Sequence, residues 1–229
     1  MAVKKSELYS SLWESCNQLR GGMDASQYKD YVLVVLFVKY ISDRAKSGDS
    51  QLIEVPRGAS FDDLVRLKGK SNIGEEFNKI LNSIAEANDL DGVINVADFN
   101  DEAKLGKGKD LVETVSNLIG AFQKPELDFV NNRADNDDLL GDAYEYLMKN
   151  FASESGKSKG QFYTPSEVSR VMSKVIGIHK DTRHSLSIYD PTCGSGSLLL
   201  KAWHETLHPD SASIFGQEKD ISNVGMAKM

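Results

Sequence analysis

The sequence has few cysteines and no long apolar run, and both absences exclude classes of protein. Cys16 and Cys193 are its two cysteines, and neither belongs to a CxxC pair or a metal-like cluster. This argues against a disulfide scaffold and favours a reducing, cytoplasmic location. The longest apolar run, residues 31–38, is far shorter than the roughly 20 residues that cross a bilayer. No apolar segment follows the charged N-terminus, so we expect neither a secretory signal nor a membrane partner.

Basic residues are fewer than acidic residues in this sequence. Lysine and arginine number 27 against 34 aspartates and glutamates, which gives a formal net charge of -7. An acidic chain attracts a phosphate backbone poorly, so we expect either no nucleic-acid binding or partner chains that supply most of the positive field. A small basic cluster, Lys104, Lys107 and Lys109, is expected to be solvated, with phosphate contact as the less favoured alternative.

Apolar residues at helical spacing fill the first two-thirds of the chain. Such stripes cover residues 8–19, 73–84, 111–122 and 139–151. Residues 31–38 are rich in β-branched side chains, yet their flanks extend the segment beyond strand length, so a helix from a cap at Asp24 to about Arg44 is expected. The pattern predicts an α-helical N-terminal domain over residues 1–152.

A change of pattern follows residues 153–160, which contain no strongly apolar side chain and are expected to form a linker. Thr164, Pro165 and Glu167 together predict a helix start with a capping box. Strands are then expected at 186–189 and 214–217, with helices at 198–207 and from about Asp220. This order is typical of the beginning of a parallel α/β sheet over residues 161–229.

The loop from Asp190 to Ser197 follows the first expected strand and opens a helix. Gly194 and Gly196 allow a tight turn and a close approach to a ligand. Glu218 follows Gly194 by 24 positions at the end of the next strand, a spacing that suits a carboxylate on a ribose. The pattern indicates a nucleoside cofactor, although an ordinary turn with a solvated aspartate is the alternative.

The third position of a dinucleotide fingerprint would be Leu199, so that fingerprint fails. A carboxylate at Asp190 is badly placed against a pyrophosphate and well placed to pair with a cationic amino group. S-adenosylmethionine carries such a group and no phosphate, so it is the favoured ligand.

Several segments resemble a known family. Residues 160–165, GQFYTP, resemble the start of the methyltransferase domain of amino-methylating DNA methyltransferases, and residues 190–197 and 216–218 resemble their first and second cofactor motifs. The segments that begin at Leu19 and Leu139 are similar to the helical domain of type I restriction-modification methylation subunits.

The resemblance implies an α-helical N-terminal domain followed by the beginning of a Rossmann-like α/β methyltransferase domain. It implies transfer of a methyl group from S-adenosylmethionine to adenine N6 in double-stranded DNA, with the adenine turned out of the stack. It also implies a specificity subunit and a restriction subunit as partners, which would explain the acidic charge. A single-chain N6-adenine DNA methyltransferase is the related alternative.

The resemblance also implies roles for individual residues. Asp190 would contact the amino group of the cofactor, and Glu218 would hold its ribose. Tyr163 is equally expected to pack beside the sheet, and Cys193 is expected to be a small filler, with no activating neighbour for nucleophilic work. The residues expected to wrap the methionine end are Gln161, Phe162, Tyr163, Thr164, Pro165 and Ser166. The residues expected to line the loop are Thr192, Gly194, Ser195, Gly196 and Ser197.

One feature of the family is missing. Its catalytic Asn-Pro-Pro-aromatic motif needs adjacent prolines, and all five prolines here stand alone. No catalytic residue is therefore assigned, and we expect a truncated chain that transfers no methyl group by itself.

Three rival functions remain for comparison. Residues 204–208, HETLH, match the zinc-protease signature, which we expect to be a coincidence because Pro209 should end the helix there; no metal site is predicted. A dinucleotide-dependent oxidoreductase is disfavoured by the failed fingerprint. The helical domain could also serve as a subunit-interaction module without any cofactor.

Overall fold

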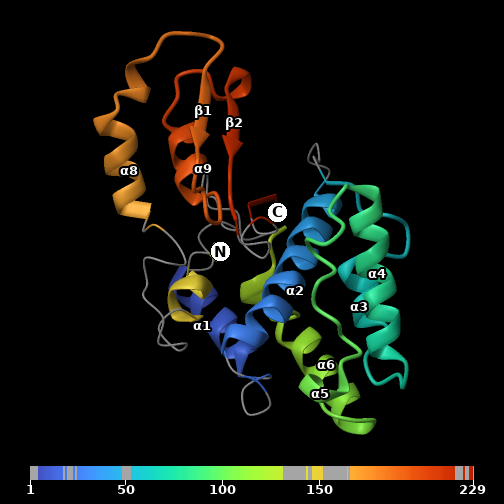
Figure 1. Ribbon diagram of the computed structural model, residues 1–229. Helices are drawn as coiled ribbons and strands as arrows, with labels where there is room; N and C mark the ends of the chain where they lie inside the picture. The colour runs from blue at the N-terminus through green and yellow to red at the C-terminus, as the bar shows by residue number, and fades with distance from the viewer. Residues whose placement is uncertain are drawn as a thin grey trace. The chain divides into compact units, whose positions relative to one another are not determined.

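The chain forms two compact units, residues 1–155 and 156–229 (Figure 1). The computed structural model describes residues 5–17, 19, 23, 25–47, 53–130, 143, 146–151, 164, 166–219, 224, 227 and 228. The two units are described separately. Over the described residues, no helix combines the length and the apolar character that a membrane span requires.

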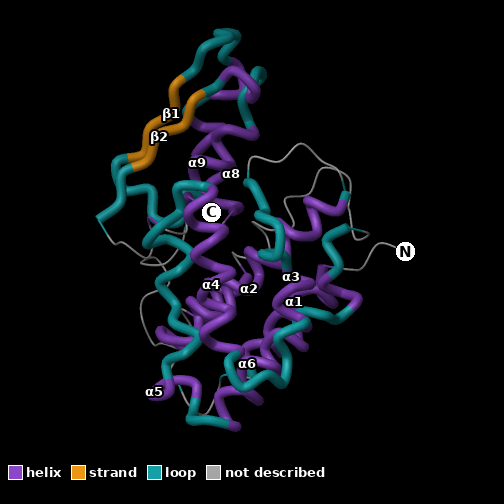
Figure 2. The backbone as a smooth tube through the Cα atoms, turned by 90° about the vertical axis from the view of Figure 1, so that its right-hand side faces the viewer, coloured by secondary structure: helices purple, strands orange, loops and turns teal. Residues whose placement is uncertain are grey.

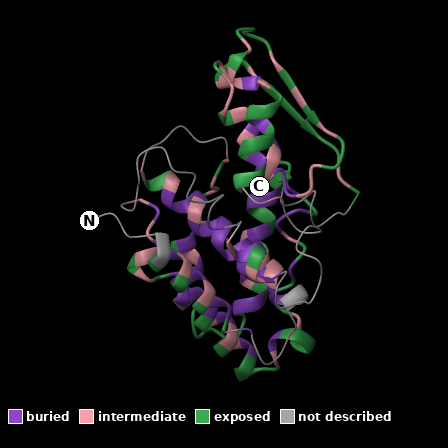
Figure 3. Ribbon diagram, turned by 90° about the vertical axis from the view of Figure 1, so that its left-hand side faces the viewer, coloured by how far each residue is buried: buried purple, intermediate pink, exposed green. Residues whose placement is uncertain are grey.

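The first unit is helical, as the periodicity predicts. Its helix α2 runs to Lys46, two residues past the expected end, and its apolar stretch 31–38 is buried throughout (Figure 3). A short helix without a label covers residues 146–151. The labelled helices are α1 (Lys5–Cys16), α2 (Ala25–Lys46), α3 (Phe61–Val65), α4 (Ile73–Ala87), α5 (Glu102–Leu105), α6 (Lys109–Ala121) and the 3-10 helix η1 (Pro125–Leu127).

Helix α3 is attached to α2 through its first turn. Ser60 caps α3, accepting from the backbone of Asp63, while the Asp63 carboxylate accepts the Ser60 N–H at 3.0 Å. The next backbone N–H, that of Phe61, donates to Ser42 Oγ on α2 at 2.8 Å. These bonds satisfy N–H groups that the start of any helix leaves without intrahelical partners.

The second unit contains two parallel strands joined through a helix (Figure 2). Strand β1 (Ser187–Asp190) pairs with β2 (Ser213–Gly216), with Asp190 opposite Gly216. Each strand begins and ends one residue away from its expected place. The other elements are α8 (Ser166–Val175), η3 (Ile178–Lys180), α9 (Ser197–His204) and η4 (Pro209–Ser211). Of the helix expected from Asp220, the structure describes residues 224, 227 and 228, which are helical.

The expected end of the helix at Leu207 is wrong. Helix α9 ends at His204, and Glu205 is its C-terminal cap. The reason is a local fold-back: Trp203 Nε1 donates to the Pro209 carbonyl at 2.8 Å, and Thr206 Oγ1 donates to the Trp203 carbonyl at 2.8 Å. These bonds hold residues 205–208 in a turn rather than in a further helical turn.

Helix α8 buries its small polar face. The helix packs on α9. Its buried residues are Ser169 and Ser173, which are 0% and 1% exposed. Ser173 Oγ donates to the Ser169 carbonyl at 2.8 Å. The apolar residues that share the other face lie exposed, Val175 at 80%. They are Val168, Val171, Met172 and Val175, and Ile176, which follows the helix, is exposed as well.

Candidate functional site

Two carboxylates lie at the same end of the two-stranded sheet. Asp190 is the last residue of β1, and Glu218 follows the end of β2 by two residues. The ladder continues past the last strand pair, because Gln217 N–H donates to the Asp190 carbonyl at 2.9 Å. Parallel strands thus bring both acidic residues to one edge, where α/β sheets commonly bind ligands.

The loop after β1 is hydrogen-bonded to both carboxylates. Asp190 Oδ1 accepts the Thr192 N–H at 2.9 Å, and Glu218 Oε2 accepts the Gly194 N–H at 3.0 Å. Between them, the Cys193 N–H donates to the Gln217 carbonyl at 2.9 Å. The loop is therefore laid across the end of β2, and the two side chains face a shared stretch of backbone.

The two glycines of the loop occupy conformations that favour glycine. Gly194 has φ 56° and Gly196 has φ 81°, both in the left-handed region. Gly196 is also the N-cap of α9, and a glycine has no side chain of its own that could accept from the first-turn N–H groups of that helix.

Ser195 lies inside the loop and is 9% exposed. Its buried Oγ has no hydrogen-bond partner among the described residues. A buried hydroxyl without a partner is costly, which points to a missing acceptor or donor at this place. Thr192 is exposed, and Ser197, the first residue of α9, is half-buried.

Cys193 is a poor nucleophile in this setting. Burial raises the pKa of its thiol above the ordinary value of 9.0, and the negative charges of Asp190 and Glu218 raise it further. The thiolate, which is the reactive form, is therefore disfavoured at neutral pH. Cys193 instead packs against Gly216, a contact that the sequence pattern does not reveal.

Reasoning from the sequence also missed a side-chain pair that links the same two strands. Tyr189 Oη donates to Gln217 Oε1 at 2.8 Å, linking β1 to the segment after β2. Gln217 lies within the predicted second motif, but its partner follows from the strand register alone. Alternation along β1 places Tyr189 and Asp190 on opposite faces.

Part of the expected cofactor segment falls outside the described residues, namely Gln161, Phe162, Tyr163 and Pro165. Thr164 is described and half-buried. Ser166 begins α8, and its side chain is outside the described set. The described site therefore consists of residues 190–197 and 216–218.

The two histidines of the zinc-protease signature, His204 and His208, do not lie on one helix as they would in a metalloprotease. Helix α9 ends at its first histidine, His204, whereas His208 lies beyond the turn and stacks on His184 with ring centroids 4.1 Å apart. The two histidines do not belong to one helix. Within the part of the chain that the structure describes, no three His, Cys, Asp or Glu residues are grouped as metal ligands.

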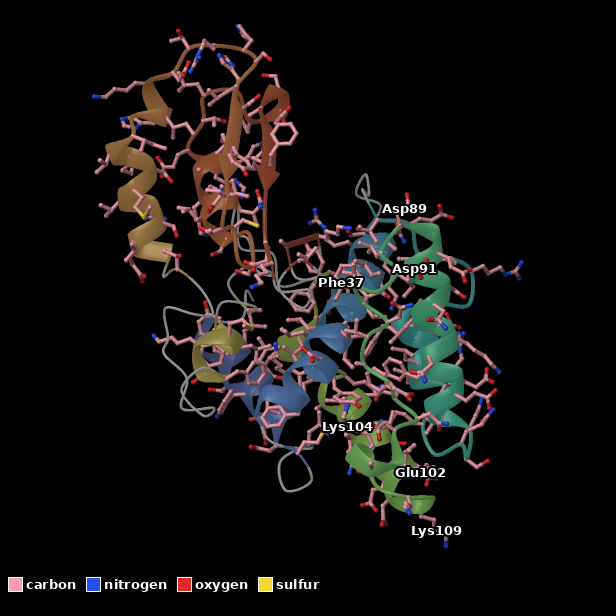
Figure 4. The ribbon with its side chains drawn as sticks, in the orientation of Figure 1. Phe37, Asp89, Asp91, Glu102, Lys104 and Lys109 are labelled. Atoms are coloured by element: carbon pink, nitrogen blue, oxygen red, sulfur yellow. The ribbon has the colours of Figure 1, made fainter. Side chains whose placement is uncertain are left out.

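The basic cluster of Lys104, Lys107 and Lys109 has acidic residues among and beside its lysines. Figure 4 shows Lys104, Glu102 and Lys109 at the same end of the helical unit, on α5 and at the start of α6. Lys104 pairs with Asp101 at 3.3 Å, and Asp110 lies in the first turn of α6. The local charges largely offset one another, as expected for a solvated surface.

Comparison with known sequences connects both units to one kind of protein. Residues 8–122 match the family described as the HsdM N-terminal domain, and residues 135–229 match N-6 DNA Methylase. The first match alone covers half of the chain. The chain belongs to the type I restriction-modification methylation subunit family. This confirms the resemblance drawn from residues 160–165, 190–197 and the two helical segments.

Individual relatives of these methylation subunits agree with that assignment. The MpnII methylase subunit of Mycoplasma pneumoniae is 28% identical over 95% of this chain and 48% of its own length. The EcoKI methylase subunit of Escherichia coli K12 is 26% identical over 87% of this chain and 35% of its own. The type I methyltransferase subunit from Streptococcus thermophilus, a solved structure, has a TM-score of 0.78 and 26% identity, covering 99% of this chain and 55% of that one. The chain thus spans about half the length of such relatives or less.

Proposed function

We propose that this chain is part of a subunit that methylates adenine N6 in DNA, and that residues 190–197 and 218 hold S-adenosylmethionine. The observation that carries this proposal is the joint attachment of Asp190 and Glu218 to one glycine-containing loop at the end of two parallel strands. The matches to N-6 DNA Methylase and to type I methylase subunits support it.

The residues present fit that cofactor. Asp190 uses Oδ1 for the Thr192 N–H, and its Oδ2 has no hydrogen bond among the described residues, so it can pair with an ammonium group. Ser195 supplies a buried hydroxyl in need of a partner. Glu218 accepts the Gly194 and Lys219 N–H groups, which occupy two of the roughly four acceptor sites of a carboxylate. These two bonds hold the carboxylate at the end of β2, where it would accept from ribose hydroxyls.

When bound, the cofactor would supply an electrophilic methyl group on a sulfonium. The chain's own residues would bind and orient it: Asp190 at the amino group, Glu218 at the ribose, and the loop backbone of Gly194 and Gly196 underneath. Thr192, Ser195 and Ser197 would line the loop, and residues 161–166 would enclose the methionine end. Fixed orientation of this kind is the main contribution that a protein makes to an in-line transfer.

The remaining parts of the proposal concern the larger assembly. We propose a Rossmann-like methyltransferase domain that begins at residue 161, a linker at 153–160 and a helical domain at 1–152, with DNA and the specificity and restriction subunits as partners. The net charge of -7 supports a division of labour in which other chains provide most of the grip on DNA. Because the 229 residues contain no Asn-Pro-Pro motif, the chain by itself should transfer no methyl group.

Titration calorimetry with S-adenosylmethionine and with NAD tests the cofactor proposal. We expect the chain to bind the former and not the latter. Asp190→Asn should weaken binding by about 10- to 100-fold, because a charge-assisted hydrogen bond contributes about 1.5–3 kcal/mol. Asp210→Asn is the matched control, an exposed aspartate in the same unit. Binding of NAD alone would favour an oxidoreductase. Binding of neither would leave the helical interaction module as the better function.

A further inference from the structure

Gly216 and Cys193 touch where the loop crosses the end of β2. A Cβ atom on residue 216 would lie 2.6 Å from Cys193 Sγ and 3.1 Å from Cys193 Cβ. It would also lie 3.1 Å from Leu199 Cδ1. The first distance is shorter than side chains tolerate, so any larger residue at 216 must displace its neighbour. The thiol fills the space that the missing side chain leaves.

Cys193 has little freedom to move away. Its N–H donates to the Gln217 carbonyl at 2.9 Å, one residue after Gly216, and its carbonyl accepts the Gly196 N–H at 2.8 Å. The first bond ties it to the segment after β2 and the second ties it to the start of α9. A side chain on residue 216 would therefore push against backbone that is held at both ends.

The residues on either side of Cys193 make the bonds to the two carboxylates. Thr192 N–H donates to Asp190 at 2.9 Å, and Gly194 N–H donates to Glu218 at 3.0 Å. Hydrogen bonds weaken quickly beyond about 3.2 Å, so a displacement of a few tenths of an ångström at Cys193 would disturb both. The height of the loop above β2 thus decides where both carboxylates point.

We propose that Gly216 and Cys193 form a positioning pair that sets the loop against β2, so that Asp190 and Glu218 are aimed at one ligand. The inference rests on the proposed function, since the ligand is taken to be S-adenosylmethionine. Gly216 has no positive φ that would itself require glycine. The requirement for glycine at this position is the close contact with Cys193.

A double-variant cycle tests the pair. Gly216→Ala should weaken S-adenosylmethionine binding about tenfold or more, because an added methyl group in a tight contact forces a shift of the backbone. Adding Cys193→Gly removes both sulfur and Cβ, so that Leu199 Cδ1, at 3.1 Å, is the one close atom that remains of the three. The double variant should restore affinity to within about threefold of the Cys193→Gly single variant. Gly120→Ala is the matched control, because its new Cβ would meet only the flexible Lys68 side chain.

A readout independent of ligand is the Gly194 amide in NMR spectra. We expect its N–H to lose hydrogen-exchange protection in Gly216→Ala and to regain it in the double variant. If Gly216→Ala and the unaltered chain show equal affinity for S-adenosylmethionine and equal exchange protection of the Gly194 amide, the proposed positioning pair is overturned. If Gly216→Ala does not fold, the double variant decides. Recovery of its fold and affinity supports the pair, and a folded double variant without restored affinity overturns it.

Absence of S-adenosylmethionine binding by the unaltered chain would instead refute the proposed cofactor. The exchange protection of the Gly194 amide would still report on the contact between Gly216 and Cys193.

Discussion

Asp43 Oδ2 on α2 accepts the backbone N–H of Phe129 at 3.0 Å, across 86 positions of sequence. The same oxygen pairs with Lys39 Nζ at 2.5 Å, and both side chains are buried. Lys39 also lies over the ring of Phe61, 5.2 Å from its centroid. One carboxylate on α2 thus neutralises a buried cation and anchors the segment after η1.

Asp43→Ala should destabilise the helical unit by about 3–5 kcal/mol, because it leaves Lys39 as a buried charge without its partner. The Phe129 N–H loses its acceptor in the same variant. Urea denaturation followed by circular dichroism measures the change. Asp62→Ala is the comparison, since its pair with Lys46 is exposed and should contribute less than about 1 kcal/mol. Equal losses in the two variants would contradict the central role of Asp43.

Ser60→Ala should cost about 1 kcal/mol, because it removes the N-cap of α3. Hydrogen bonding from Ser60, followed by the Arg66 charge, holds the pKa of Asp63 below its ordinary value of 3.8. A depressed pKa stabilises the fold above the ordinary value, and that contribution is lost as pH falls toward the folded value. The difference in unfolding free energy between Ser60→Ala and the unaltered chain should therefore shrink in acid. Carbon-detected NMR titration should find a higher Asp63 pKa in the variant, and an unchanged pKa would contradict the capping box.

Cys193 should react slowly with thiol reagents, because burial and the two neighbouring carboxylates raise its pKa. At a given pH below that value, fewer thiolates are present than for an unperturbed cysteine, so the alkylation rate should keep rising above pH 9. Cys16→Ser leaves Cys193 as the one thiol to be followed by iodoacetamide labelling. Asp190→Asn removes one negative charge and should speed labelling at pH 8. A rate equal to that of a free thiol would be incompatible with this environment.

Helix α8 provides a test of which face is buried. Ser173→Leu should destabilise the second unit by about 1–3 kcal/mol, since it places extra volume where α8 packs on α9. Val175→Ser should change stability by less than about 0.5 kcal/mol, because Val175 is exposed. Thermal unfolding of both variants measures the contrast. The reverse order of effects would mean that the apolar face is the packed one.

Much of the local structure follows from the sequence. The flanks of residues 31–38 correctly predict a helix despite the β-branched side chains of that segment, because the length of the segment can be read from its neighbours. The cap expected at Asp24 lies outside the described residues. The alternation of strand and helix after residue 186 is likewise present. Asp190 and Glu218 were expected at strand ends from spacing alone, and the register of β1 and β2 brings them to one edge. Their roles toward a cofactor stay predictions.

The amino-acid pattern by itself determined the longer helices, the two strands and the residues that resemble cofactor motifs, since these depend on neighbours within a few positions. It did not predict the short helices α3 and α5. Tertiary structure alone decided the early end of α9, the buried serine face of α8, the anchoring of Phe129 by Asp43 and the contact of Cys193 with Gly216. In three of these cases the partner group lies on another element. The fourth, the end of α9, depends on a turn that closes on the Pro209 carbonyl. Periodicity cannot report such contacts, because it records which side chains share a face and not what that face meets.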